Sequence, residues 1–157
     1  MSAEPPVLFT IDAHGIGTLT LNRPAQLNAF DLPMIEAWRA ALESAEADDR
    51  VRVIVVTGAG RAFCAGGDFD EMAKFSELDS LGRKNFLYRH VHRIALTLER
   101  MEKPVIAAIN GFAMGGGFML VERTDLRVAA RGAVFEVSEA KRWLLGGYNH
   151  GHIANLP

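Results

Sequence analysis

Two stretches of this chain share one design: VIVVTGAGRAFCAGGD, from Val53 to Asp68, and VIAAINGFAMGGGF, from Val105 to Phe118. Each begins with a short, continuous run of β-branched and small apolar residues, which is typical of a strand buried on both faces. Glycines follow, and a helix is expected after them. The strands themselves are predicted over Val51–Thr57 and Val105–Asn110. Buried strands that alternate with helices indicate an α/β domain.

The segments on either side of these stretches continue the alternation. Asp31 is a favourable N-cap for a helix, and Pro33 is tolerated in its first turn. Pro104 ends a longer helix, because proline disfavours helix at the residue before it. The other predicted elements are strands over Val7–Asp12, Ile16–Leu21, Leu126–Ala130 and Val134–Val137, and helices over Leu32–Ala47 and Leu81–Arg100. The chain shows no linker and no clean repeat, so one domain over residues 1–157 is predicted.

Composition narrows the class of protein. The 157 residues are 49% hydrophobic and carry a formal net charge of −2, which is typical of a globular protein and does not favour nonspecific nucleic-acid binding. Cys64 is the single cysteine and cannot form an internal disulfide, which favours a reducing compartment. The N-terminus lacks a signal-peptide pattern, and the longest apolar run, Val105–Ile109, is far shorter than the roughly 20 residues of a membrane helix. We therefore expect a cytoplasmic protein that binds neither nucleic acid nor membranes.

The glycine clusters suggest a specific chemistry. Glycine lets the backbone approach a ligand closely, and amides at a helix start lack partners within the helix. Two such turns placed together could direct two N–H donors at one oxygen, which is the arrangement of an oxyanion hole. The simpler interpretation is a pair of ordinary tight turns. A dinucleotide-binding fingerprint is disfavoured, because Phe63 stands where the third glycine after Gly58 and Gly60 would be.

A series of motifs along the chain adds a family resemblance. The motifs are LNRP (Leu21–Pro24), LNAF (Leu27–Phe30), GRAFCAGGDFDEM (Gly60–Met72), KPVIAAINGFAMGGGF (Lys103–Phe118), TDLRVAA (Thr124–Ala130) and FEVSEAK (Phe135–Lys141). Their order and spacing resemble those of the enoyl-CoA hydratase/isomerase (crotonase) family. The resemblance implies a spiral of ββα units that binds a CoA thioester, here without the family's C-terminal helical region. We therefore expect residues 1–157 to be an acyl-CoA-binding domain and a fragment of a longer chain.

The resemblance also implies roles for particular residues. The two oxyanion donors fall on the amides of Gly67 and Gly116, and the backbone at Ala65 and from Asp68 through Phe69 to Asp70 follows the CoA. Members of the family are usually trimers or dimers of trimers, so a homotrimer or hexamer is expected. They need no metal or redox cofactor, because the CoA thioester is the substrate.

The acid–base residues depart from the hydratase pattern. The resemblance puts one glutamate of the hydratase pair at position 119, where this chain has Met119, and the other at Glu139. A thioether cannot move a proton, so one retained carboxylate favours double-bond isomerisation over water addition. Glu122 is the nearest substitute, although a solvated or ion-paired helix residue is the simpler interpretation. Glu139 has its own simpler interpretation, a surface ion pair with Lys141 or Arg142. The alternative function is a catalytically weak acyl-CoA-binding protein.

Several further residues are weighed between a site and a structural role. Cys64 is expected to be buried filler, and His90 and His92 are expected to face different directions on one helix. The His150 and His152 pair could chelate a metal but more simply belongs to a polar loop. Asp68 and Asp125 are expected to order backbone. Phe69, Phe112 and Phe118 are expected to belong to the core or to the wall of the acyl pocket, with the core as the default. Arg23, Arg61 and Lys74 are candidates for contacts with the CoA phosphates or are solvated surface charges.

Overall fold

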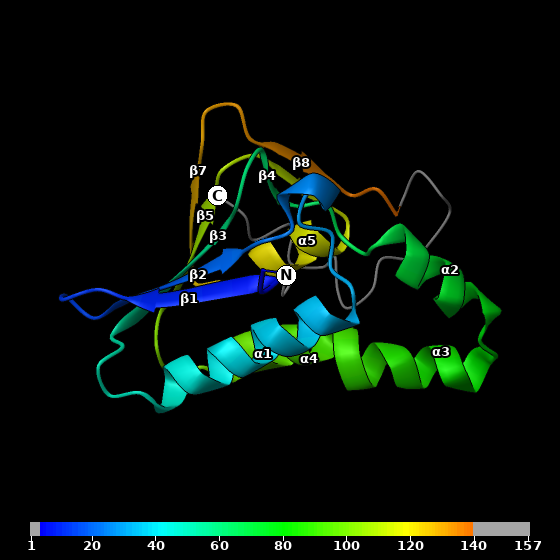
Figure 1. The fold of residues 1–157 in the computed structure, drawn as a ribbon, viewed down its shortest axis with the longest axis horizontal. Coiled ribbons are helices and arrows are strands. Elements are labelled where there is room, and N and C mark those ends of the chain that lie inside the picture. The colour runs from blue at the N-terminus through cyan, green and yellow to red at the C-terminus, as the bar shows by residue number, and fades with distance from the viewer. Residues whose placement is uncertain (1–3, 140–157) are drawn as a thin grey trace.

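The computed structural model describes residues 4–139 of the 157. Two sheets and a set of helices make up the fold (Figure 1). The larger sheet has the strand order β1-β2-β3-β5-β7, and the smaller has the order β4-β6-β8. All neighbouring strands are parallel except β1 and β2, which form an antiparallel hairpin. The strands are β1 Val7–Ile11, β2 Ile16–Leu21, β3 Val53–Gly58, β4 Ala62–Cys64, β5 Val105–Ile109, β6 Phe112–Met114, β7 Leu126–Ala129 and β8 Val134–Glu136.

The chain climbs through both sheets by repeating one unit. Each of β3, β5 and β7 in the larger sheet leads into a short strand of the smaller sheet, β4, β6 and β8 respectively. Helix α2 (Phe69–Glu77) follows β4, and helix α5 (Gly116–Val121) follows β6. Since every repeat steps to the next parallel position in both sheets, the path is a spiral of ββα units. The predicted fold class is confirmed.

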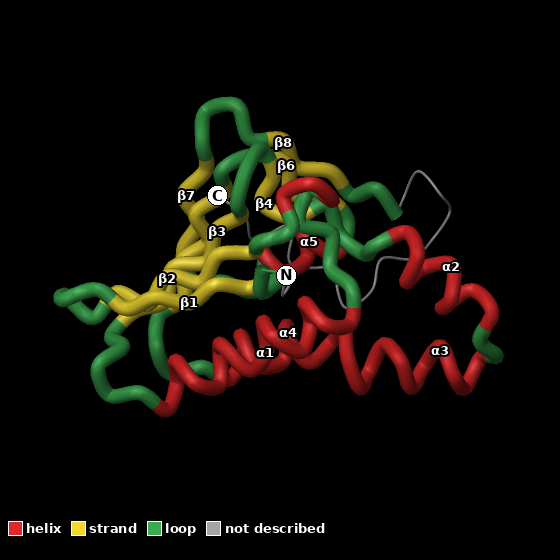
Figure 2. Tube along the Cα trace, in the orientation of Figure 1, coloured by secondary structure: helices red, strands yellow, loops and turns green. Residues whose placement is uncertain are grey.

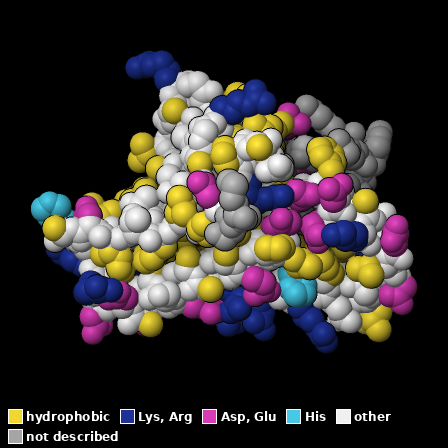
Figure 3. Space-filling view, in the orientation of Figure 1, with side chains coloured by type: hydrophobic (Ala, Val, Ile, Leu, Met, Phe, Trp, Pro, Cys, Tyr) yellow, Lys and Arg dark blue, Asp and Glu magenta, His cyan; other side chains and the backbone are white. Residues whose placement is uncertain are grey.

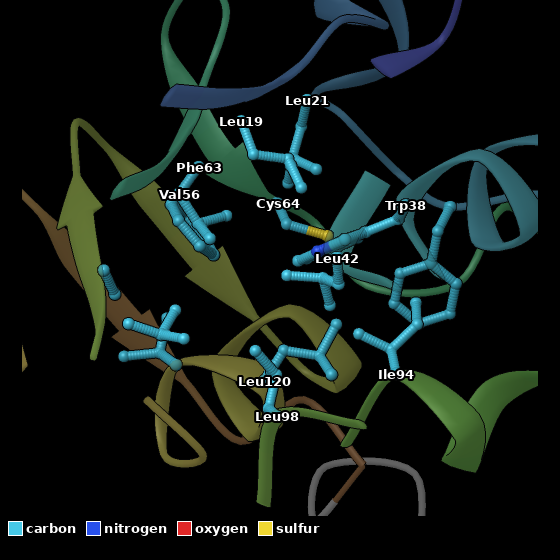
Figure 4. Packing of buried hydrophobic residues seen from close by; sticks show 14 of the residues in the cluster. Leu19, Leu21, Trp38, Leu42, Val56, Phe63, Cys64, Ile94, Leu98 and Leu120 are labelled. Carbon is cyan, nitrogen blue, oxygen red and sulfur yellow. The ribbon is translucent and has the colours of Figure 1, made fainter. Parts of the chain in front are cut away.

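Helices α1 (Leu32–Ala47) and α4 (His92–Arg100) lie together against one side of the sheets (Figure 2). The Asp31 side chain caps α1 by accepting a hydrogen bond from the Met34 amide at 2.9 Å, as its N-cap role predicts. Trp38, on α1, is 1% exposed and belongs to the same hydrophobic cluster as Ile94, on α4, and Cys64, on β4 (Figure 4). This core fixes the ends of the short strands from which the glycine turns leave.

The structure refines three predictions. The long helix begins at Ser80 as α3 (Ser80–Phe86), passes through a π-helical segment over Leu87–Val91, and continues as α4. Strands β4 and β6 were hidden within the glycine stretches, because three residues carry too little periodicity to be recognised. Helix α2 follows the first glycine stretch as expected, but it buries no residue completely, so no apolar stripe marked its bounds in the sequence. Across residues 4–139, every helix falls short of the length and apolarity needed to cross a bilayer.

Candidate active site

The first glycine turn joins β4 to α2. Gly66 has φ +91°, a left-handed conformation that favours glycine. The next residue, Gly67, pairs with Phe30 in an isolated parallel bridge. In this bridge the Phe30 amide donates to the Gly66 carbonyl at 2.8 Å, and the Asp68 amide donates to the Phe30 carbonyl at 3.0 Å. The bridge therefore fixes the Gly67 peptide without using the Gly67 N–H.

Polar side chains brace this first turn from behind. Asn28 is fully buried with φ +56°, and its amide nitrogen donates to the carbonyls of Ala59 and Ala62 at 2.9 and 2.8 Å. Arg23 lies 3.1 Å from an Asp68 carboxylate oxygen and 3.2 Å from one of Asp31. Asp68 also caps α2, because its side chain accepts from the backbone amide two residues on. The predicted role of Asp68 in ordering backbone is confirmed.

The second glycine turn joins β6 to α5 and is held mainly by close packing. Gly115 has φ +52°, and its amide donates to the Glu136 carbonyl at 2.8 Å. A Cβ on Gly116 would stand 2.7 Å from Cζ of Phe30 and 3.9 Å from Cα of Gly66. A Cβ on Gly117 would stand 2.2 Å from the Cys64 carbonyl oxygen. The two turns therefore touch, and only glycine fits at the contact.

Glu139 lies against the second turn. A Cβ on Gly115 would come within 2.9 Å of Oε1 of Glu139 and 2.7 Å of Oγ of Ser138. The other carboxylate oxygen, Oε2, is buried and accepts no hydrogen bond from the part of the chain that the structure describes. Glu139 is the last residue of that part, so the alternative ion pair with Lys141 or Arg142 lies outside the described residues.

The amides of Gly67 and Gly116 share one property. Neither N–H donates to an acceptor within residues 4–139. For Gly116 the reason is general, since the first amides of an α-helix have no acceptor in the preceding turn. For Gly67 the reason is the bridge to Phe30, which uses the amide on its far side. Two unused donors thus belong to two turns that are in contact.

A groove and a cavity meet at these residues. The outer groove has a volume of about 680 Å³, and the inner cavity has one of about 170 Å³. The groove is lined by the predicted CoA-binding residues Ala65, Phe69 and Asp70, together with Arg61. Both spaces are lined by Gly67, Asp68, Met72, Gly116 and Glu139. The predicted site residues therefore meet around one junction.

The two spaces differ in character. The inner cavity is lined mostly by apolar side chains, namely Phe30, Leu32, Ile35, Met72, Phe75, Phe86, Leu87, Val91 and Met119. In the space-filling view, acidic and basic side chains gather over the start of α2, beside hydrophobic ones (Figure 3). Asp70 and Glu71 lie in that first turn of α2. A ligand with a polar end and an apolar end matches this pair of spaces.

Several sequence interpretations are corrected here. Phe69 is 75% exposed, so the core assignment was wrong; it stands at the start of α2, where its neighbours face the groove rather than the core. Glu122 is 4% exposed, so a solvated role was wrong. Of the phosphate candidates, Arg23 is held by two aspartates and Lys74 lies 2.7 Å from Glu71, whereas Arg61 lines the groove.

Other interpretations are confirmed. Cys64 is fully buried, and burial raises the pKa of its thiol to about 12. The Asp125 carboxylate orders backbone by accepting from the Val105 amide at 2.8 Å. The core assignment is confirmed for Phe118, which is 6% exposed, but not for Phe112, which is only half-buried and lies outside the hydrophobic cluster. His150 and His152 lie outside the described residues.

Two residues were missed or not placed by sequence reasoning. Asn28 was quoted only as part of the LNAF motif, and no role was predicted for it. Its left-handed φ depends on tertiary hydrogen bonds that no local sequence pattern encodes. His92 was predicted only to face away from His90, which is confirmed: His90 lies 3.2 Å from Glu36, whereas His92 lines the inner cavity. Burial lowers the pKa of the His92 imidazole below its ordinary value.

Comparison with known proteins identifies the family to which this chain belongs. The model of the enoyl-CoA hydratase/isomerase family matches residues 12–151, and the chain belongs to this family. It is 38% identical over 135 residues to the 1,2-epoxyphenylacetyl-CoA isomerase of Escherichia coli, covering 83% of this chain and 50% of that protein. It is 35% identical over 142 residues to YngF of Bacillus subtilis, covering 90% and 53%.

Solved structures agree with the fold. The enoyl-CoA hydratase of Mycobacterium smegmatis superposes with a TM-score of 0.88 at 35% identity, covering 97% of this chain and 58% of that one. The enoyl-CoA hydratase of Bacillus anthracis superposes with a TM-score of 0.84 at 30% identity, covering 96% and 58%. The chain thus spans about half the length of the curated relatives it matches, 53% of YngF for example.

Proposed function

We propose that this chain holds the thioester end of an enoyl-CoA and shifts its double bond through an enolate held in a backbone oxyanion hole. The observation that carries the proposal is the junction itself. Two glycine turns touch there, each with an unused N–H, and Glu139 lies against one of them. A family fold supports the same chemistry.

Substrate binding follows from the two spaces. The outer groove is suited to the CoA, with Ala65, Phe69 and Asp70 along it. The apolar inner cavity is suited to the acyl chain. The thioester carbonyl then falls at the junction, where the amides of Gly67 and Gly116 can both donate to its oxygen. The CoA thioester is the substrate, and the proposed reaction uses no added cofactor.

The proposed reaction depends on stabilising the negative charge that develops on the thioester oxygen. Removing a proton from C2 moves an electron pair onto the thioester oxygen, and two preorganised donors stabilise that negative charge. Glu139 can accept the C2 proton, because it is one of the residues that line both the groove and the cavity. Met119 lines the inner cavity at 3% exposure and offers no proton acceptor. Returning the proton at C4 completes an isomerisation, whereas adding water would require a second group to activate it.

The test is an assay of the protein with 3-enoyl-CoA and 2-enoyl-CoA. We expect conversion of 3-enoyl-CoA to 2-enoyl-CoA, and we expect Glu139→Gln to lower kcat by about 10²–10⁴. Glu136→Gln is the matched control, since Glu136 lines only the outer groove and should affect KM rather than kcat. Undiminished turnover by Glu139→Gln would refute the assignment of the base.

A second candidate function is a catalytically weak acyl-CoA-binding protein. Met119 favours it, because a thioether stands in the cavity wall where the family's other carboxylate would be. Thioester binding with no turnover of either enoyl-CoA would select this alternative. Absence of thioester binding would refute both.

A further inference from the structure

The walls of the inner cavity are rich in aromatic and thioether side chains. Three phenylalanines line it, namely Phe30, Phe75 and Phe86, together with Met72 and Met119. Phenylalanine presents a flat, rigid face that packs well against the edge of another ring. Methionine is flexible and fills the irregular space that remains around such a ring. The walls are therefore suited to a compact, ring-shaped apolar group.

The size of the inner cavity also matches one ring. Its volume is about 170 Å³. An apolar cavity of about 150 Å³ is large enough to hold one benzene molecule. Gly67 and Gly116 line both this cavity and the outer groove, so no side chain of theirs narrows the passage between the two spaces. With the thioester carbonyl at that passage, a group of about six carbons fills the space behind it.

Two of the phenylalanines form a ring pair that stands apart from the core. Phe75, on α2, and Phe86, at the end of α3, have ring centroids 5.6 Å apart and ring planes tilted by 55°. Phe86 also lies 5.4 Å from the ring of His90, which restrains its orientation. Both phenylalanines are half-buried and lie outside the main hydrophobic cluster. Because both line the inner cavity, an apolar occupant would remove their rings further from water.

We propose that the acyl group bound here carries a six-membered carbon ring on C2, and that the Phe75–Phe86 pair selects this ring over an open chain. The proposal deepens the proposed function and rests on it, because it takes the thioester to lie at the junction of Gly67 and Gly116. A ring also loses less conformational freedom on binding than an open chain of the same carbon number.

The proposed isomerisation applies to such a substrate without any added reactant. In a 3-enoyl-CoA of this kind, C3 and C4 belong to the ring and the double bond lies between them. The reaction removes a proton from C2 and adds one at C4. The double bond then lies between C2 and C3, outside the ring, and no atom is gained or lost.

The experiment compares two saturated thioesters of equal carbon number, cyclohexylacetyl-CoA and octanoyl-CoA, by isothermal titration calorimetry. The CoA is common to both, so the difference in affinity reports the shape of the acyl group. We expect the native protein to bind cyclohexylacetyl-CoA about tenfold more tightly. Phe75→Ala and Phe86→Ala should each reduce that ratio to near one, because the removed ring leaves space for an extended chain.

Leu81→Ala is the matched control for these two variants. Leu81 also lies on α3, but it is 63% exposed and lines neither the groove nor the cavity. This variant should keep the native ratio. Circular dichroism checks that all three variants fold, as expected for side chains outside the main hydrophobic cluster.

The outcomes separate this proposal from the broader one. Equal or tighter binding of octanoyl-CoA by the native protein would overturn the ring-bearing acyl group. An unchanged ratio in both phenylalanine variants would overturn selection by the ring pair. Cyclohex-1-enylacetyl-CoA and 3-octenoyl-CoA test turnover separately: selective binding without turnover of either would refute the isomerisation and support the ring-bearing acyl group. Absence of binding of both saturated thioesters would refute the proposed function and this proposal with it.

Discussion

The two glycine turns reach the same position in the ββα unit by different physical means. The first is braced by polar side chains: Arg23 reaches its aspartate, and Asn28 donates to carbonyls of the β3–β4 connection that precedes it. The second is fixed by close packing, since a Cβ on Gly115, Gly116 or Gly117 would stand 2.2–2.9 Å from a neighbouring atom. By contrast, a Cβ on Gly67 would meet Met72 at 3.4 Å and Phe30 at 3.9 Å, both ordinary contact distances.

The difference teaches which contacts position each donor. In the first turn, where hydrogen bonds hold the backbone, a side chain has room at Gly67, although not at Gly66. Where glycines pack face to face, the position of the amide depends on the absence of a side chain. The same substitution should therefore have unequal effects in the two turns.

The largest effect is expected when a methyl group is added to the second turn. Gly116→Ala places Cβ 2.7 Å from Cζ of Phe30, so the turn must shift and its amide moves away from the thioester oxygen. We expect kcat/KM for 3-enoyl-CoA to fall by about 10²–10³, the usual cost of one lost oxyanion donor. Gly67→Ala is the matched variant and should lose much less, because its Cβ meets Met72 at ordinary contact distance. Equal losses would break the distinction between the turns.

The next effect concerns the residue that holds the connection leading into the first turn. Asn28→Ala removes the donor to the Ala59 carbonyl and one of two donors to the Ala62 carbonyl, and it puts alanine at φ +56°. We expect the free energy of unfolding to fall by about 3 kcal/mol, from the lost buried hydrogen bonds and the left-handed backbone. Urea denaturation measures it, with Asn22→Ala as the control, since Asn22 bonds only at the exposed N-terminal edge. A loss no larger than that of the control would show that Asn28 does not hold this connection.

A smaller effect is expected from the ion-pair cluster. Arg23→Met removes the cation between Asp31 and Asp68, whose side chains are 22% and 14% exposed. Partial exposure limits the expected loss in free energy of unfolding to about 1–2 kcal/mol. Arg39→Met, which removes pairs with the exposed Glu36 and Glu43, should cost about 0.5 kcal/mol or less. A reversed order would contradict the bracing role of Arg23.

The smallest effect is a change in the reactivity of Cys64, at the contact between the two turns. Cys64 is fully buried with a thiol pKa of about 12, and Gly117 packs on its carbonyl. Iodoacetamide at pH 8 should leave the native thiol unmodified, because almost none of it is thiolate. Gly117→Ala should make Cys64 measurably reactive by forcing the turns apart, as mass spectrometry can follow. Rapid labelling of the native protein would contradict the close packing of Gly117 against Cys64.

The sequence predicted much of this fold, because its strongest signals are local. The strand runs before each glycine cluster, the Asp31 cap and the motif series led to the ββα spiral. What it could not supply depends on tertiary contact. The π-helical segment before His92, the buried hydrogen bonds of Asn28 and the bounds of α2 have no periodic signature. Exposure of Phe69 was mispredicted for the same reason, since an aromatic residue at a groove rim resembles one in a core.

The central claim is that the amides of Gly67 and Gly116 bind one thioester oxygen. Isotope-edited infrared spectroscopy of a bound acyl-CoA, labelled with ¹³C at the thioester carbonyl, tests it most directly. Two donors on one oxygen should move the carbonyl stretch to lower frequency than in free acyl-CoA. Gly116→Ala should reverse most of that shift, and Gly67→Ala should reverse less of it. An unshifted carbonyl in the bound native protein would contradict the claim.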